Sequence, residues 1–360
     1  MDVPLSSGLQ TDALVPALTV RRWVKTIIVL VMVSILTLLI CVQYGTERIP
    51  LGEVFRLLLA SSDIPAGSTG VSPGVILWEV RVPRLILAFL VGSSLATVGV
   101  ALQALLRNPL ADPYILGISS GAALGAALAL QFGASWAFWG FSALHLFAFV
   151  GAAVTMIGIY HVAAAGGRIP VQTLLLAGVI INAILSALIL FITSLSDSTS
   201  AFRLFFWLMG SLATLGYAGL LALAVYVILG TSLLFAQGRH LNLLSLGEEP
   251  AQGLGLEVEG VKRVIFFTSA LLTGAVVAVS GLIGFVGMIV PHAVRMVLGP
   301  DHRLVLPAAA LVGGTFLAIA DTIARSLLAP SELPVGVITA LCGGPFFIYL
   351  LVTRRTSQIG

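Results

Sequence analysis

The sequence predicts an all-α polytopic membrane protein with ten transmembrane helices. Of its 360 residues, 59% are hydrophobic and only 9% are charged, whereas soluble domains carry roughly 25% charged residues. The mean hydropathy is +1.10. Apolar runs of about 20 residues recur along the chain, and each can cross a bilayer as a helix. We therefore expect one transmembrane domain over residues 24–352, with short tails at 1–23 and 353–360.

The individual spans follow from the apolar runs and from the polar or proline-containing breaks between them. The first run follows a basic cluster and exceeds the roughly 7–15 residues of a signal-peptide core, so we interpret it as a retained span. The seventh and eighth runs are separated only by Ser280 and Gly281. The expected spans are 24–44, 84–106, 114–132, 142–164, 171–195, 215–236, 262–280, 282–298, 304–326 and 334–352.

The distribution of basic residues predicts the orientation. With the N-terminus in the cytoplasm, twelve of the 18 Lys and Arg residues fall in cytoplasmic segments, as the positive-inside rule favours. An even number of spans returns the C-terminus to the cytoplasm. The six outward arginines are many for this rule and indicate a role of their own.

Two segments between spans are expected to be helical without crossing the membrane. Residues 196–214 are amphipathic and predict a short helix at the outer surface. Residues 237–261 form the largest inner loop and predict two short helices, broken at Gly247 and Pro250. Its leucines fit either an interfacial helix or a docking element for a cytoplasmic partner. The acidic and glycine residues that follow them favour the docking element.

The sequence shows none of the motifs that would indicate an enzyme. It holds no P-loop, no zinc-ligand spacing and no nucleophile elbow. Cys41 and Cys342 lie inside apolar runs, which indicates neither a disulfide framework nor a metal site. The net charge of +3 is spread over the loops, so there is no nucleic-acid footprint. We expect no cofactor and a chain whose main environment is the lipid bilayer.

A few polar residues lie within the spans. Asn182 and Ser186 are four residues apart and share one helix face. They fit interhelical hydrogen bonding and the lining of a pathway equally well. Asp321 and Arg325 share the same spacing and can pair, either as a structural ion pair or for a role at the outer surface. Glycines at 117, 121 and 125 predict a close helix–helix contact.

Several motifs in a fixed order resemble the permease subunits of ABC importers for iron–siderophores, haem and cobalamin, the FecCD/cobalamin-type family. The resemblance covers nearly all of the chain from residue 81 onward. Its motifs are Arg81-Val-Pro-Arg84, residues 103–125, Leu174-Leu-Leu-Ala-Gly178, Phe206-Trp-Leu-Met-Gly210, Leu246-Gly-Glu-Glu-Pro-Ala251, residues 284–292, Glu332-Leu-Pro-Val-Gly336 and Gly343-Gly-Pro-Phe346.

The resemblance implies a type II ABC importer permease in the bacterial inner membrane. Such a permease works as a dimer, usually a homodimer, with two cytoplasmic ATP-binding subunits and a periplasmic substrate-binding protein. The fifth and tenth spans would line the path along the dimer axis. Among the implied substrates, an iron–siderophore comes first, followed by haem and cobalamin.

The resemblance also implies roles for particular residues. The binding protein would dock on Arg81, Arg84 and Arg325. ATPase coupling would involve Leu241, Leu244, Glu248, Glu249, Ala251, Leu254 and Gly255. The cytoplasmic gate would comprise Asn108, Leu110, Val171 and Gln172. For lining the pathway we choose Asn182 and Ser186 on their polarity within the span.

Two other classes of protein are alternatives to an ABC importer permease. A secondary transporter driven by an ion gradient needs an ionisable residue deep in its path. Asp321 is the one strong candidate, and Arg325 can neutralise it. A membrane scaffold without transport activity does not explain the outer arginines and the inner docking loop together.

Overall fold

The computed structural model describes residues 18–45, 47–59, 72–164, 168–213 and 215–356. In this part of the chain, ten helices occupy the positions of the ten expected spans. Seven are long and apolar enough to cross a membrane: α1 (Val20–Cys41), α4 (Val82–Leu105) with the helical turns before it, α6 (Ala143–Ala163), α7 (Val171–Leu195), α9 (Tyr217–Ala236), α12 (Val258–Ser280) and α14 (His302–Ser326). Three are shorter: α5 (Ile118–Gln131), α13 (Val286–Leu298) and α15 (Val335–Thr356).

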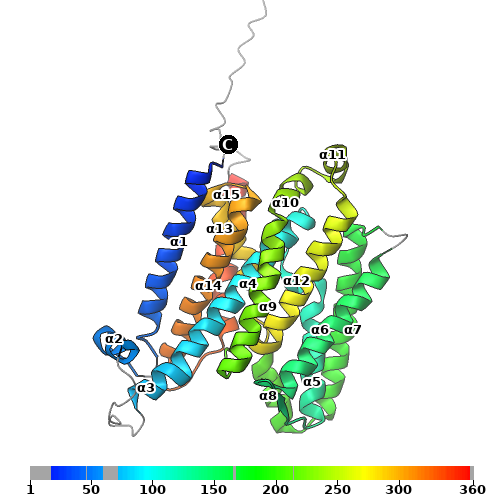
Figure 1. The fold of residues 1–360 in the computed structure, drawn as a ribbon. Helices are drawn as coiled ribbons and strands as arrows, with labels where there is room; N and C mark the ends of the chain where they lie inside the picture. The colour runs from blue at the N-terminus through cyan, green and yellow to red at the C-terminus, as the bar shows by residue number, and fades with distance from the viewer. Residues whose placement is uncertain (1–17, 46, 60–71, 165–167, 214, 357–360) are drawn as a thin grey trace, which may run out of the picture.

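The ten helices run side by side as one bundle (Figure 1). At one end, here the α8 end, lie α2 (Leu51–Leu59), α3 (Pro73–Val75) and α8 (Ser198–Leu208). At the opposite end, the α11 end, lie α10 (Gly238–Leu244) and α11 (Glu248–Gly253). Helix α1 starts at the α11 end, and helix α15 ends there (Figure 1). This agrees with an even number of spans.

The ends of the chain differ slightly from the predicted tails. Helix α1 begins at Val20 and helix α15 continues to Thr356. Thr19 caps α1, because its side-chain oxygen accepts a hydrogen bond from the main-chain N–H of Arg22 at 3.2 Å. Most of the predicted tails, residues 1–17 and 357–360, lies outside the described residues.

Helices α4, α12 and α14 form the centre of the bundle. In their most apolar stretches 83%, 67% and 72% of the residues are buried, against 11% in α1 and α7. Helices α1 and α7 accordingly lie at opposite edges of the bundle (Figure 1). Close packing at the centre depends on glycine, since a Cβ added to Gly99 would come within 3.0 Å of the carbonyl oxygen of Gly287. Backbones of α4 and α13 therefore touch directly.

Two predicted spans begin later than expected. Residues 106–117 hold only the 3-10 turn η2 (Pro113–Leu116), and α5 starts after Gly117, whose φ is +75°. Residues 281–285 are likewise outside any helix, and Phe285 adopts a φ of +70°. The Tyr114 hydroxyl joins these two irregular segments by accepting a hydrogen bond from the Ile283 N–H at 2.7 Å. The left-handed residues, which an apolar run does not reveal, set the helix starts.

The glycines at 117, 121 and 125 do not form one continuous stripe. Gly121 and Gly125 press α5 against α6, where an added Cβ would meet the Gly151 and Phe147 carbonyl groups. This confirms the predicted packing role for these two glycines. Gly117 instead precedes α5 and faces the Gly178 carbonyl oxygen of α7.

The inner loop forms the two predicted helices, but only one of the two predicted breaks is correct. The chain turns at Gly247, whose φ is +120°. Pro250 lies inside the first turn of α11, where its missing N–H has no intrahelical partner to lose. A proline at this place starts a helix rather than ending one.

Asp112 gives the α4–α5 turn a pH-dependent stability. Its carboxylate accepts a hydrogen bond from the Tyr114 N–H at 2.9 Å, and burial raises its pKa to about 6. The folded protein thus keeps the proton of the Asp112 carboxyl to a higher pH than the unfolded chain does. The stabilisation of the folded state by this group is therefore complete below about pH 4 and is lost as the pH rises through about 6. We expect the melting temperature in detergent to fall over this range, and Asp112→Asn to remove that component.

The control is Asp197→Asn at the exposed N-cap of α8. Hydrogen bonds from Ser200 and Thr199 lower the pKa of Asp197, so its contribution has the opposite sign and is lost as the pH falls. An identical pH profile for the wild type and Asp112→Asn would contradict the role of Asp112.

Candidate functional site

The α10–α11 segment presents a small exposed surface at the α11 end. Leu241, Leu244 and Ala251 are fully buried in the chain itself, where they pack the two short helices onto the bundle. Leu246 and Leu254 are 63% and 62% exposed. Glu249 and Gly255 are exposed beside them. If a partner docks here, it touches this second group, and the three buried residues can act only by holding the helices in place.

Lys262, a residue that the sequence did not single out, fixes this segment to two other elements. Its ammonium group is buried and lies 3.0 Å from Glu248 of α11 and 2.8 Å from Glu259 of α12. It also donates to the Ile169 carbonyl oxygen at 2.9 Å, while Glu259 accepts from the Ile169 N–H at 2.8 Å. We call these four residues the Lys262 clamp. Both main-chain polar groups of Ile169 are thereby held two residues before α7 begins.

The predicted gate residues lie at the same end, in the turn after α4 and at the start of α7. The Asn108 side chain accepts a hydrogen bond from the Leu110 N–H at 2.9 Å, which closes the turn after α4. Asn108 also lines a cavity of 290 Å³ together with Arg107, Ser245 and Arg295. Val171 and Gln172 open α7 directly after the Lys262 clamp. The clamp thus links Glu248 to this second predicted gate, whose gating role stays a prediction.

Asn182 and Ser186 lie on an exposed face of α7. The Asn182 side-chain oxygen accepts a hydrogen bond from the Ser120 hydroxyl of α5. Asn182 therefore makes an interhelical bond and still stands on the exposed face, so the two interpretations are compatible. Lining of a pathway by these residues stays a prediction.

A cluster of charges ties α4 to α14 at the α8 end. Asp321 is wholly buried, with Arg84 at 2.9 Å and Arg325 at 3.6 Å. The predicted pair of Asp321 and Arg325 is present, but Arg84 is the closer partner. Arg84 makes a second ion pair, with Glu332 at 2.9 Å. The attraction between these opposite charges, together with several hydrogen bonds, offsets the cost of removing them from water.

The predicted docking arginines differ in their surroundings. Arg81 is 3% exposed and donates to the main-chain oxygens of Val42, Gln43 and Glu47. Arg325 is 4% exposed and donates to the Cys41 carbonyl oxygen at 3.0 Å. Both hold the end of α1 in place, so in this conformation an acidic group from outside does not reach them. Arg84 differs from both, because one of its partners, Glu332, is itself exposed. Docking at these arginines stays a prediction.

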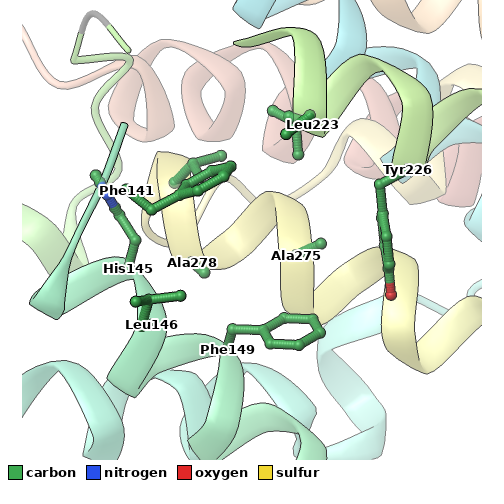
Figure 2. Close-up of a pocket in the computed structure, with 10 residues that line it drawn as sticks. Phe141, His145, Leu146, Phe149, Leu223, Tyr226, Ala275 and Ala278 are labelled. Atoms are coloured by element: carbon green, nitrogen blue, oxygen red, sulfur yellow. The ribbon is translucent and has the colours of Figure 1, made fainter. Parts of the chain in front are cut away.

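The largely apolar cavity in Figure 2 lies apart from every predicted site residue. It has a volume of 240 Å³ and lies between α6, α9 and α12, with Phe149, Leu223, Tyr226 and Ala275 among its lining residues. His145 at its edge accepts a hydrogen bond from the Ser142 N–H at 3.0 Å and caps α6. His145 therefore has a structural role at the start of α6.

Comparison with known proteins places this architecture in one family. Residues 30–353 match the FecCD transport family. The chain is 43% identical, over 79% of its length and 75% of the relative, to the cobalamin import system permease protein BtuC of Halobacterium salinarum. It is 44% identical, over 78% of its length and 84% of the relative, to the hemin transport system permease protein HmuU of Yersinia pestis. A solved structure described as an inward-facing metal-chelate type ABC transporter superposes with a TM-score of 0.77 at 33% identity, covering 92% of this chain and 99% of that one.

The chain therefore belongs to the FecCD transport family. It is a transmembrane permease of the ABC importer class.

Proposed function

We propose that this permease imports a metal chelate across the bacterial inner membrane, driven by two separate cytoplasmic ATP-binding subunits. In this proposal the α11 end, with both termini, faces the cytoplasm. The α8 end faces the periplasm and receives a substrate-binding protein. The observation that carries the proposal is the Lys262 clamp, because it joins an exposed docking surface on α11 to the start of α7.

The clamp supplies a mechanism for coupling. A partner that moves against Leu246, Glu249, Leu254 and Gly255 displaces α11. Glu248 then carries Lys262 with it, and Lys262 and Glu259 carry Ile169. Since Ile169 lies two residues before α7, the movement reaches Val171 and Gln172 and then the face with Asn182 and Ser186. Charge-assisted hydrogen bonds transmit such a displacement because they are short and directional.

A second copy of the chain is the proposed partner of α7. Only 11% of its most apolar stretch is buried in one subunit, so lipid or another subunit covers the rest. Asn182 and Ser186 lie on the exposed side, where contact with lipid is costly for an amide. A homodimer with a path between its subunits gives these polar groups a suitable environment.

The relatives support the proposed class of substrate, a metal chelate. Experiment can decide which chelate this permease carries. Their names refer to cobalamin and hemin, so both chelates are supported at least as well as the iron–siderophore favoured above. Binding of each chelate by the cognate substrate-binding protein decides among the three.

The structure disfavours the alternative of an ion-gradient-driven transporter. Such a transporter needs a carboxylate that exchanges protons or cations with water. Asp321 is wholly buried and is bound by Arg84 at both oxygens, with Arg325 nearby. A carboxylate enclosed in this way has no contact with water through which it could exchange a proton or a cation.

Crosslinking tests the docking surface. In a variant with Cys342→Ser and Cys41→Ala, we expect Leu246→Cys and Leu254→Cys to crosslink to the ATP-binding subunits with a short bifunctional maleimide. Leu221→Cys on α9 is the control, because Leu221 is 67% exposed but lies on a spanning helix. Equal crosslinking at the three positions, or none at the first two, would overturn the assignment of this surface.

A further inference from the structure

Arg84 holds two carboxylates that differ in their access to water. Its Nε atom lies 3.0 and 3.1 Å from the two oxygens of Asp321, and Asp321 is wholly buried. Its Nη1 atom donates to both oxygens of Glu332 at 3.1 and 2.9 Å, and the Glu332 side chain is 50% exposed. An ion pair that water can reach contributes little to stability. Asp321 is thus the fixed partner of Arg84, and Glu332 is the exchangeable one.

Glu332 lies in the connection between α14 and α15, residues 327–334. Leu333 donates from its N–H to the Ala324 carbonyl oxygen at 3.0 Å, and Val335 donates to the Gly210 carbonyl oxygen at 3.1 Å. The Glu332–Arg84 pair adds a side-chain link from this connection to the first turn of α4. It therefore helps to hold the start of α15 at the α8 end.

The charges around Arg84 fit one additional carboxylate when Glu332 leaves. Arg84 and Arg325 balance Asp321 and Glu332, so these four side chains sum to zero. Without Glu332 the remaining three sum to +1. Arg81 adds positive charge nearby, since its guanidinium group is bound by neutral main-chain oxygens. A single carboxylate per subunit restores neutrality at Arg84.

We propose that Glu332 occupies the position on Arg84 that a carboxylate of the substrate-binding protein takes on docking. Docking then replaces an internal ion pair by an intermolecular one and releases residues 327–334 together with the start of α15. This proposal rests on the proposed function, because it requires a substrate-binding protein at the α8 end. It assigns Glu332 as an internal competitor that sets both docking affinity and the position of α15.

Docking affinity tests the competition directly. The complete complex in nanodiscs is titrated with its fluorescently labelled substrate-binding protein at several salt concentrations. Glu332→Gln removes the competing charge but leaves Arg84 paired with Asp321. We expect docking to tighten by about two- to fivefold, the factor that corresponds to an exposed ion pair.

The matched control is Glu79→Gln, which removes the same charge from an exposed residue near the start of α4. It changes only long-range attraction, which salt screens. Equal affinities for Glu332→Gln and Glu79→Gln would overturn the exchange and leave the proposed function intact. If the binding protein docks to none of the variants, including the wild type, both proposals fail.

A spin label tests the release of the connection. Ser331→Cys, exposed beside Glu332, carries a nitroxide in the variant without native cysteines. We expect its mobility to rise when the binding protein docks, and to be high before docking in Glu332→Gln. Equal mobility of the label with and without Glu332→Gln, both before and after docking, would contradict the release of residues 327–334.

Discussion

Lys262→Met is expected to lower substrate uptake by more than about tenfold, while the partner subunits continue to hydrolyse ATP. The methionine fills the buried volume but cannot donate to Glu248, Glu259 or the Ile169 carbonyl oxygen. Breaking a buried ion pair costs about 3–5 kcal/mol. The cost here is smaller because the Glu248 and Glu259 side chains are 35% and 23% exposed and can be hydrated. We therefore expect a folded complex in which α11 no longer moves α7.

The measurement is the ratio of substrate transported to ATP hydrolysed in proteoliposomes. Arg263→Met is the control, because the neighbouring Arg263 is 47% exposed and lies 3.8 Å from Glu257. Its ratio should match the wild type. Glu248→Gln, which keeps a hydrogen-bond acceptor for Lys262, should give an intermediate ratio. A wild-type ratio in Lys262→Met would remove the clamp from the coupling mechanism.

Gly99→Ala is expected to prevent assembly of the bundle, or to lower its melting temperature by many degrees. The added Cβ would come within 3.0 Å of the carbonyl oxygen and the main-chain carbons of Gly287. Backbone atoms cannot rotate away as a side chain can, so α4 and α13 must separate. Overpacking a core costs about 1–3 kcal/mol and occasionally more, and a backbone contact between two central helices belongs at the upper end.

Size-exclusion chromatography after heating, in detergent, measures this effect. Gly158→Ala in α6 is the control, since an added Cβ there has no atom within 4 Å. Alanine is also the better helix former by about 1 kcal/mol, so this variant should be as stable as the wild type or more stable. If Gly99→Ala matches Gly158→Ala, the two backbones have room that the structure does not show.

The ten helices could be predicted because the length of an apolar run sets where a helix can cross a bilayer. The starts of α5 and α13 could not, because they depend on left-handed residues, Gly117 and Phe285. An apolar residue such as Phe285 gives no local signal for that conformation. The order of the helices could thus be predicted from the sequence, and the starting residues of α5 and α13 could not.

The candidate site could be predicted in the parts that depend on residues close together in the sequence. Leu254 and Gly255 lie on an exposed surface next to α11, as a docking loop requires. Lys262 was missed because its partners come from three segments, and only Glu259, three residues earlier, was visible in the sequence. Arg81 and Arg325 were counted as outward charges, yet both are buried against the end of α1. A sequence shows the charge of such a residue and conceals the main-chain oxygens that surround it.

Uptake by the reconstituted permease shows whether ATP or an ion gradient drives transport. Proteoliposomes holding this chain and its ATP-binding subunits are supplied with chelate-loaded binding protein, with ATP inside and with ionophores that abolish every ion gradient. We expect uptake to require ATP, to stop with a hydrolysis-deficient ATP-binding subunit and to persist without gradients. Uptake that proceeds without ATP and collapses with an ion gradient would contradict it.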